Sequence, residues 1–442
     1  MQRTRRSVMR AAGVGAGGAL AATTTACAIG AAGNQGSGGT KPSQTLAPAT
    51  LNVITWAANN DNATLYLTHL FDGIKKALPQ LTVSNAPAPQ GEVLTKLLAQ
   101  AAAGTAPDSV MLRPQDITPA YNQKLLAVLD TYLKRDAKEI NGDDFFPAAI
   151  QRGQKEGKQV AFPTNMSVSV PQFNKTLFTA AGVKPPDDTW TWDTYLDAAR
   201  RIAKRDPESS APPIIGTSMP DYQVLVWAWG GQIVDQTQTK FLLDEDKATT
   251  ALQWWADLKV RHAVAPLPSD PVVGNGNEQN RFLAGQLGML IGGITVGQIE
   301  LITTAPPWNV FVMPKGPAKR VTLSNGASLA MTADSKQKEA AWAWIKYAVS
   351  PEIERFAAVE AKQPPSRKSA LAAQSALPAV YNRKLVADSA AFAQEVPYLA
   401  QYDALNKLIG EALAPVQAGQ KSAFQAMREI KPQADALLML AR

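Results

Sequence analysis

The side chains that enzymes most often use for catalysis are scarce or badly spaced in this sequence. The two histidines, His69 and His262, have no second ligand at the spacing of a metal site, and there is no H-E-x-x-H motif. Neither a G-x-S-x-G motif nor a Walker A motif occurs. The carboxylate pairs 143–144 and 187–188 are adjacent and so point in different directions, whereas a glycosidase needs two carboxylates that face each other. The sequence predicts a binding protein, not an enzyme, with no cofactor and no metal.

The first residues have the order of an export signal. Residues 4–10 read TRRSVMR and resemble a twin-arginine motif, and residues 11–22 form an apolar stretch too short to span a bilayer. Gly13, Gly15 and Gly18 fit G-x-G-x-x-G, but no strand precedes them, so we expect no nucleotide site. Removing the four arginines before residue 27 lowers the net charge from +7 to +3, which argues against a nucleic-acid partner.

Cys27 is the only cysteine, which excludes an internal disulfide and a multi-cysteine metal cluster. Residues 24–27 read TTAC and resemble a lipobox, although Thr24 stands where leucine is usual. The sequence therefore predicts a signal peptide over residues 1–27, lipid modification of Cys27, and a Gly- and Ser-rich flexible tether over residues 28–49. The expected location is the outer face of the cytoplasmic membrane.

Strands and helices alternate at the start of the mature chain, which is the order that positions a binding loop after each strand. The apolar spacing gives a strand at 51–56, a helix capped by Asn62 over 65–78, a strand at 81–83, a helix over 93–101 that Gly104 stops, and a buried strand at 109–112. This alternation predicts a parallel sheet covered by helices, with ligand loops at the carboxyl ends of the strands.

Short motifs are spread from residue 50 to residue 370. They are AAAGTAPDSVML at 101–112, FNKTLFTAAGV with the following PP and TW at 173–192, FLAGQLGM at 282–289, MPKGP at 313–317, SNGASLAM at 324–331 and QPPSR at 363–367. Together they resemble the family 1 extracellular solute-binding proteins, the sugar-capturing subunits of ABC importers.

This resemblance implies a periplasmic-binding-protein-like α/β fold of two lobes, with a ligand cleft between them and hinge crossings near residues 163, 311 and 363. The first lobe would contain residues 50–163 and 311–363, and the second lobe residues 164–310 and 364–442. A solute that touches both lobes would bind the closed state better and shift the population toward it.

The resemblance also implies which residues border the cleft. Sugar hydroxyls both donate and accept hydrogen bonds, and the C–H faces of a sugar ring pack on aromatic rings. The expected ligand-binding residues are Trp56, Asn59, Asp116, Asn165, Trp227, Trp229, Gly293, Asn325 and Arg367. Trp192, Trp254, Trp342 and Trp344 are expected in the core instead. The family commonly has an aromatic residue near Ile294 and two tyrosines where this chain has Gln172 and Phe173, so the particular sugar is left open.

The function implied by the resemblance is that of an exported, monomeric substrate-binding protein that delivers a carbohydrate to the transmembrane subunits of an ABC permease. Three alternatives stay open. The solute could be a polyol, a glycerol-phosphate or a peptide, and basic residues at the crossings would favour a phosphate. The chain could also be a surface lipoprotein glycoside hydrolase, or a sensor or adhesion protein that binds sugar without transport.

Overall fold

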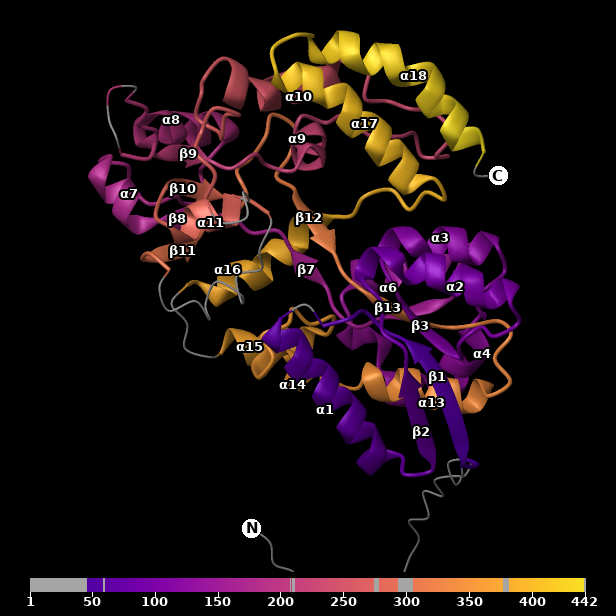
Figure 1. Ribbon diagram of the computed structural model, residues 1–442. Helices are drawn as coiled ribbons and strands as arrows, with labels where there is room; N and C mark the ends of the chain where they lie inside the picture. The colour runs from indigo at the N-terminus through magenta and orange to yellow at the C-terminus, as the bar shows by residue number, and fades with distance from the viewer. Residues whose placement is uncertain are drawn as a thin grey trace, which may run out of the picture. The chain divides into compact units, whose positions relative to one another are not determined.

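Two mixed sheets organise the chain, and a small third sheet lies between them (Figure 1). The structure is a computed structural model that describes residues 46–58, 60–206, 208, 211–273, 278–292, 305–376 and 381–440. Asn59, Gly293 and Cys27 lie outside the described residues, as do the leader and most of the tether. We call the part built on the first sheet the first lobe, and the part built on the second sheet the second lobe.

The first lobe contains a five-stranded sheet. Its strands, in spatial order, are β2 (Leu81–Asn85), β1 (Ala49–Ile54), β3 (Ser109–Leu112), β13 (Ser328–Met331) and β6 (Ala161–Pro163). β1 pairs in parallel with β2 and β3, which confirms the predicted order of the first three strands. β13 returns from far along the sequence and inserts antiparallel between β3 and β6. All residues of β3 and β13 are buried, because helices cover both faces of the sheet.

Helices and a hairpin complete the first lobe. The helices are α1 (Asp61–Ala77), α2 (Val93–Ala102), α3 (Pro114–Asn122), α4 (Asp130–Arg135), α5 (Ala137–Ile140), α6 (Pro147–Arg152), α13 (Lys338–Ala348), α14 (Pro351–Val359) and α15 (Lys368–Ser375). The 3-10 turns η1 (Gln90–Glu92) and η2 (Gly142–Asp144) and the hairpin β4 (Gln154–Lys155) and β5 (Lys158–Gln159) lie between them. The prediction that Asn62 caps α1 is wrong, because Asn60 Oδ1 accepts from the Ala63 amide at 2.9 Å.

The second lobe contains a four-stranded sheet and two long C-terminal helices. The sheet has the order β11 (Trp308–Val310), β8 (Gln172–Asn174), β10 (Leu287–Leu290) and β9 (Ile215–Thr217). Its helices are α7 (Lys175–Ala180), α8 (Trp192–Ile202), α9 (Tyr222–Ala228), α10 (Asp246–Val260), α11 (Glu278–Leu283), α16 (Arg383–Asp388), α17 (Tyr402–Gln417) and α18 (Ala423–Met439), with the 3-10 turn η3 (Ser389–Phe392) after α16. Thr191 caps α8, and Thr194 completes a reciprocal capping box. α10, α17 and α18 pack together (Figure 1).

Each lobe has its own apolar core. Trp342 and Trp344 are buried in the first lobe and Trp192 in the second, as expected from the sequence. Trp254 is partly buried and packs edge-on against Trp192, with 5.6 Å between the ring centroids. Two separate cores mean that each lobe is stabilised largely by its own contacts, which is the arrangement that a hinge requires.

The third sheet connects the lobes. It has the order β14 (Ala393–Gln394), β12 (Thr322–Asn325) and β7 (Ser167–Val168), and β7 and β12 lie between the two large sheets in Figure 1. The sequence predicts crossings at residues 311 and 363, and the structure places both later. Val321 still packs in the second-lobe core, so the second crossing is β12. α15 packs against α14, so the first lobe extends beyond residue 363 to Ser375.

Gly326, directly after β12, leaves no room for a side chain. A Cβ at this position would overlap Arg152 Nη1 and the carbonyl oxygen of Asn165. We expect Gly326→Ala to lower the free energy of unfolding by about 2 kcal/mol, because the crowded groups are held by hydrogen bonds. Gly410→Ala is the control, since a Cβ in the middle of α17 meets nothing within 4 Å. Urea unfolding of both variants checks this, and equal midpoints would contradict it.

Candidate functional site

A cavity of about 360 Å³, which we call the central cavity, is built from both lobes and the sheet that connects them. The first lobe contributes Phe146, at the start of α6, and Gln374 from α15, and the second lobe contributes Gln172 and Asp221. Ser167 and Val168 of β7 and Leu323 and Asn325 of β12 form its wall between the lobes. A solute in this cavity would therefore contact both lobes and the connecting strands at once.

A second cavity, of about 560 Å³, lies within the first lobe, and we call it the first-lobe cavity. Its lining comes from the chain after β1, the start of α1, the segment after β2 and the end of β3, so it lies at the carboxyl ends of the parallel strands, as the sequence predicts. Trp56, Asn62, Tyr66 and Asn165 are among the lining residues. Lys362 lines both cavities, so the two are neighbours in one region.

Asp221 is the acidic side chain of the central cavity. It directly precedes α9, and burial raises the pKa of its carboxyl group above the ordinary aspartate value. No hydrogen bond or ion pair joins this carboxylate to any residue that the structure describes. A Cβ on Gly292 would lie 3.4 Å from Asp221 Oδ2, so the glycine lets the chain pass close to the carboxylate. A partly buried carboxylate without a protein partner is suited to accept hydrogen bonds from a bound solute.

Asn325 and Asn165 present amide groups at the two cavities. Asn325 lines the central cavity, and its Oδ1 accepts from the Gly326 amide at 2.8 Å. Asn165 lines the first-lobe cavity, and its Oδ1 accepts from the Ala327 amide at 2.7 Å. These contacts fix the orientation of each amide, so each nitrogen is the group left to face a solute. Together with Trp56, these two are the described sequence-predicted site residues that line the central cavity or the first-lobe cavity.

Trp227 and Trp229 line neither of these cavities. Trp227 lies on the buried α9 and is 1% exposed, within the second-lobe core and beside a separate cavity near Gln394. Trp229 follows α9 and packs against Trp254, with 5.4 Å between the ring centroids. Both indoles pack in the second-lobe core, which the local aromatic and glycine pattern alone does not reveal.

Asp116 and Arg367 are each held by interactions within the first lobe. Asp116 is 2% exposed and accepts from Arg113 Nε at 2.8 Å; burial raises its pKa, while the hydrogen bonds and charge of Arg113 act in the opposite direction. Arg367 is 1% exposed, lies over the Phe145 ring, and donates from Nε to the Val349 carbonyl oxygen at 2.7 Å. The guanidinium nitrogens of Arg367 donate hydrogen bonds to other residues of the first lobe, so Arg367 stabilises the packing of that lobe.

The Trp56 and Trp229 positions predict opposite effects of truncation. Trp229→Ala should lower the free energy of unfolding by about 2 kcal/mol, because it removes a partly buried indole from the second-lobe core. It should leave solute affinity unchanged, since Trp229 touches neither cavity. Trp56→Ala should weaken affinity more than folding. Urea unfolding and calorimetric titration of the two variants measure both effects, and a loss of affinity confined to Trp229→Ala would reverse the assignment.

Sequence reasoning missed Asp221, Tyr381 and Lys362. The available signal for Asp221 was its place after the short strand β9 and before a helix, which is the carboxyl end of a strand. Tyr381 stacks on Trp308 with 5.1 Å between the ring centroids and lines the central cavity. No sequence pattern brings residue 381 beside residue 308, because the contact depends on the packing of the second lobe.

Comparison with known proteins gives a consistent picture. A family model described as bacterial extracellular solute-binding protein matches residues 69–384. A protein of Brucella abortus described as a binding protein is 26% identical over 283 residues, which cover 62% of this chain and 66% of that protein. The chain thus spans just under two thirds of that relative's length. An arabinooligosaccharide-binding protein of Halalkalibacterium halodurans is 27% identical over 125 residues, 28% of this chain and 27% of that protein.

Solved structures share the fold at low sequence identity. An ABC substrate-binding protein from Listeria monocytogenes in complex with cycloalternan has a TM-score of 0.78 at 21% identity, covering 88% of this chain and 99% of the other. The sugar-binding protein MalE of Xanthomonas citri has a TM-score of 0.74 at 18% identity, covering 89% and 98%. UgpB of Mycobacterium tuberculosis, in complex with glycerophosphocholine, has a TM-score of 0.72 at 18% identity, covering 88% and 98%. These likenesses confirm the predicted periplasmic-binding-protein-like α/β fold.

Proposed function

Because the chain belongs to the bacterial extracellular solute-binding proteins, we propose that it captures a carbohydrate outside the cytoplasm and delivers it to the transmembrane subunits of an ABC permease. In this proposal the protein is a binding subunit and catalyses no reaction. It works as a monomer that holds one solute between its two lobes.

The central cavity is the observation that carries this proposal. It combines the carboxylate of Asp221, which has no hydrogen-bond partner in the described part of the chain, with the amide side chains of Asn325 and Gln172 and the rings of Phe146 and Tyr381. A carboxylate accepts hydrogen bonds from hydroxyls, an amide both accepts and donates them, and aromatic rings pack on the C–H face of a sugar ring. The cavity volume of about 360 Å³ is within the range of small-molecule sites.

The arrangement of the lobes supports a capture mechanism. A solute in the central cavity would contact Phe146 in the first lobe, Asp221 in the second and Asn325 on the connecting sheet. Such a solute has more contacts when the lobes are closed, so it favours the closed state by the difference between its affinities for the two states. The permease would then receive the closed, loaded form.

Delivery to a membrane requires that the protein stay close to it. We propose that a twin-arginine-like leader exports the chain and that lipid on Cys27 anchors it to the outer face of the cytoplasmic membrane. Among the described residues, no helix has the length and apolar character needed to cross a bilayer. Mass spectrometry of the mature protein from the native host tests the proposed lipid on Cys27.

A solute that carries a phosphate is a second candidate. Lys362 and Arg383 both line the central cavity, and cationic side chains favour anionic ligands. Lys362 Nζ donates to the Val359 carbonyl oxygen at 2.8 Å, and Arg383 Nη1 donates to Tyr381 Oη at 2.9 Å. The protein therefore orients both cationic side chains. The carboxylate of Asp221 in the same cavity argues against an anion, which is why a carbohydrate is the first proposal.

Thermal melting against a solute panel tests the function. The full chain with Cys27→Ser is melted with mono- and oligosaccharides, polyols, glycerol-phosphates, peptides and amino acids. A ligand at 100 times its dissociation constant adds about 2.7 kcal/mol to the free energy of unfolding, which raises the melting temperature by several degrees. A shift confined to saccharides supports the proposal, and a shift confined to glycerol-phosphates replaces it with the second candidate.

Small-angle scattering tests closure of the lobes. The radius of gyration should fall when the solute that stabilises the protein is added, and an unchanged radius of gyration at saturation would contradict closure.

A further inference from the structure

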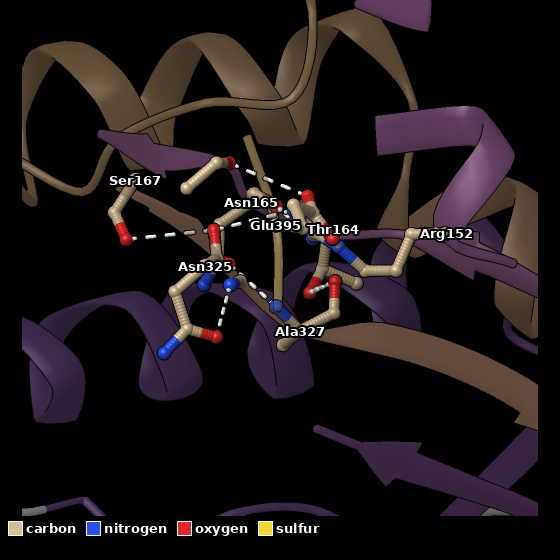
Figure 2. A network of polar contacts seen from close by, with 9 residues as sticks. Arg152, Thr164, Asn165, Ser167, Asn325, Ala327 and Glu395 are labelled. Atoms are coloured by element: carbon tan, nitrogen blue, oxygen red, sulfur yellow. Dashed lines mark hydrogen bonds and ion pairs between the residues drawn. The ribbon is translucent and has the colours of Figure 1, made fainter. Parts of the chain in front are cut away.

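The side chain of Arg152 lies where the strands of the connecting sheet meet (Figure 2). Arg152 ends α6 of the first lobe and is fully buried. Its Nη1 donates to the carbonyl oxygen of Asn165 at 3.0 Å, and its Nη2 donates to that of Asn325 at 3.2 Å. Asn165 stands just before β7 and Asn325 ends β12, so one side chain holds both of these crossings.

The counter-ion of Arg152 comes from the third strand of the same sheet. Arg152 Nε donates to both carboxylate oxygens of Glu395 at 3.1 Å, and Nη2 also pairs with Oε1. Glu395 directly follows β14, which pairs with β12, and Ser324 Oγ donates to Glu395 Oε1 at 3.3 Å. The chain continues from Glu395 into α17 of the second lobe. This buried ion pair therefore links α6 of the first lobe to the segment between η3 and α17, two elements of the second lobe.

The backbone groups that Arg152 binds belong to residues of the candidate site. Asn325 lines the central cavity and Asn165 lines the first-lobe cavity. Asn165 Oδ1 also accepts from the Ala327 amide, which ties the two crossings to each other a second time. The positions of both amides relative to a solute therefore depend on where the guanidinium of Arg152 sits (Figure 2).

We infer that the Arg152–Glu395 ion pair is the positioning element of the hinge: it holds Asn165 and Asn325 at their cavities and limits the range of angles between the lobes. This inference rests on the proposed function, because it treats the two cavities as the solute site. An arginine binds a carboxylate and two carbonyl oxygens through donors in a fixed plane, so it restricts rotation in a way that a single hydrogen bond does not. A buried charge that loses its partner must gain water or move, and at a hinge either change loosens the crossings.

Distances between the lobes test the inference without any solute. The full chain with Cys27→Ser receives cysteines at two exposed positions, Lys76 in α1 and Asp197 in α8, and spin labels on both. Pulsed electron paramagnetic resonance then gives the distribution of distances. We expect Glu395→Gln to broaden this distribution and to lengthen its mean by several ångströms. Arg152→Lys keeps the charge but loses the planar donors, so it should have the same effect to a smaller extent.

The matched control is an ion pair within one lobe whose carboxylate is buried. Asp270 accepts from Arg205 Nη2 at 3.0 Å, and both residues belong to the second lobe. Asp270→Asn should lower the melting temperature and leave the distance distribution of the parent unchanged. Equal broadening in Asp270→Asn and Glu395→Gln would overturn the inference, since it would show a general effect of losing a buried charge.

A milder variant covers the case in which Glu395→Gln does not fold. Ser324→Ala removes one hydrogen bond to Glu395 and should broaden the distribution in the same direction but less. A distribution identical to that of the parent in every folded variant of the pair would overturn the inference. Because no solute is added, this result is independent of the solute panel, so failure of the hinge inference and failure of the carbohydrate proposal are separate outcomes.

Discussion

Replacing Asp221 by asparagine should weaken binding of the stabilising solute by about ten- to hundredfold. Hydrogen bonds to a charged group contribute about 1.5–3 kcal/mol each, and among the described residues none donates a hydrogen bond to the Asp221 carboxylate. Asparagine keeps the shape and one acceptor oxygen but loses the charge. Folding should be little affected, because burial already disfavours the ionised form of Asp221 and raises its pKa. Calorimetric titration with the saccharide found by melting measures the loss.

The control for Asp221→Asn is an aspartate of the second lobe whose oxygens are used by its own loop. Asp235 Oδ1 accepts from the amides of Thr239 and Lys240 at 2.7 and 2.8 Å, and Asp235 lines neither of the two site cavities. Asp235→Asn should therefore leave affinity unchanged. A folded Asp221→Asn protein that binds as tightly as its parent would remove Asp221 from the site and weaken the case for the central cavity.

The sequence predicts the framework of the first lobe because local signals there agree with the tertiary structure. The buried run Ser109–Leu112 and the apolar stripe of α2 each specify their element, and Gly104 ends the helix region with a φ of +69°. The place of β13 between β3 and β6 has no local signal, since the partners are far apart in sequence. The resemblance assigns residues 311–363 to the first lobe without giving the position of this strand in the sheet, which the pairing of β13 with β3 and β6 shows.

The candidate site was less predictable, because a side chain's role depends on what surrounds it. An arginine in a Pro-rich turn can face solvent or a ligand, but Arg367 is buried over Phe145 and donates to carbonyl oxygens of Val349 and Ile140. These partners come from separate elements that only the fold brings together. The same holds for Asp221, whose burial and place in the central cavity follow from the packing of the second lobe. Residue type and spacing identified the chemistry needed, and packing decided which residues supply it.

Glu354 should make the protein less stable as pH rises. It lies on α14, 1% exposed, and accepts from the Ser366 amide at 2.8 Å and from Ser366 Oγ at 2.7 Å. Burial raises its pKa from 4.5 to about 8, and the hydrogen bonds from Ser366 and the charge of Arg367 offset only part of that effect. Between these two values the folded chain keeps a proton that the unfolded chain releases. The free energy of unfolding therefore falls with rising pH across this window and levels off above about pH 8.

The replacement that isolates this effect is Glu354→Gln, because glutamine has the same shape and can hydrogen-bond to Ser366 without a charge. A tenfold change in proton affinity between the folded and unfolded chains corresponds to about 1.4 kcal/mol. The free energy of unfolding of the variant should therefore match that of its parent near pH 5 and exceed it by about 3 kcal/mol near pH 8. Urea unfolding at intervals from about pH 5 to about pH 8.5 measures the difference, and subtracting the parent curve removes every other titrating group. Glu139→Gln, at a side chain that is 64% exposed, should keep the parent slope. Parallel curves for parent and Glu354→Gln would mean that Glu354 is ionised in the folded protein throughout this range, and that the turn at Ser366 opens to let water reach it.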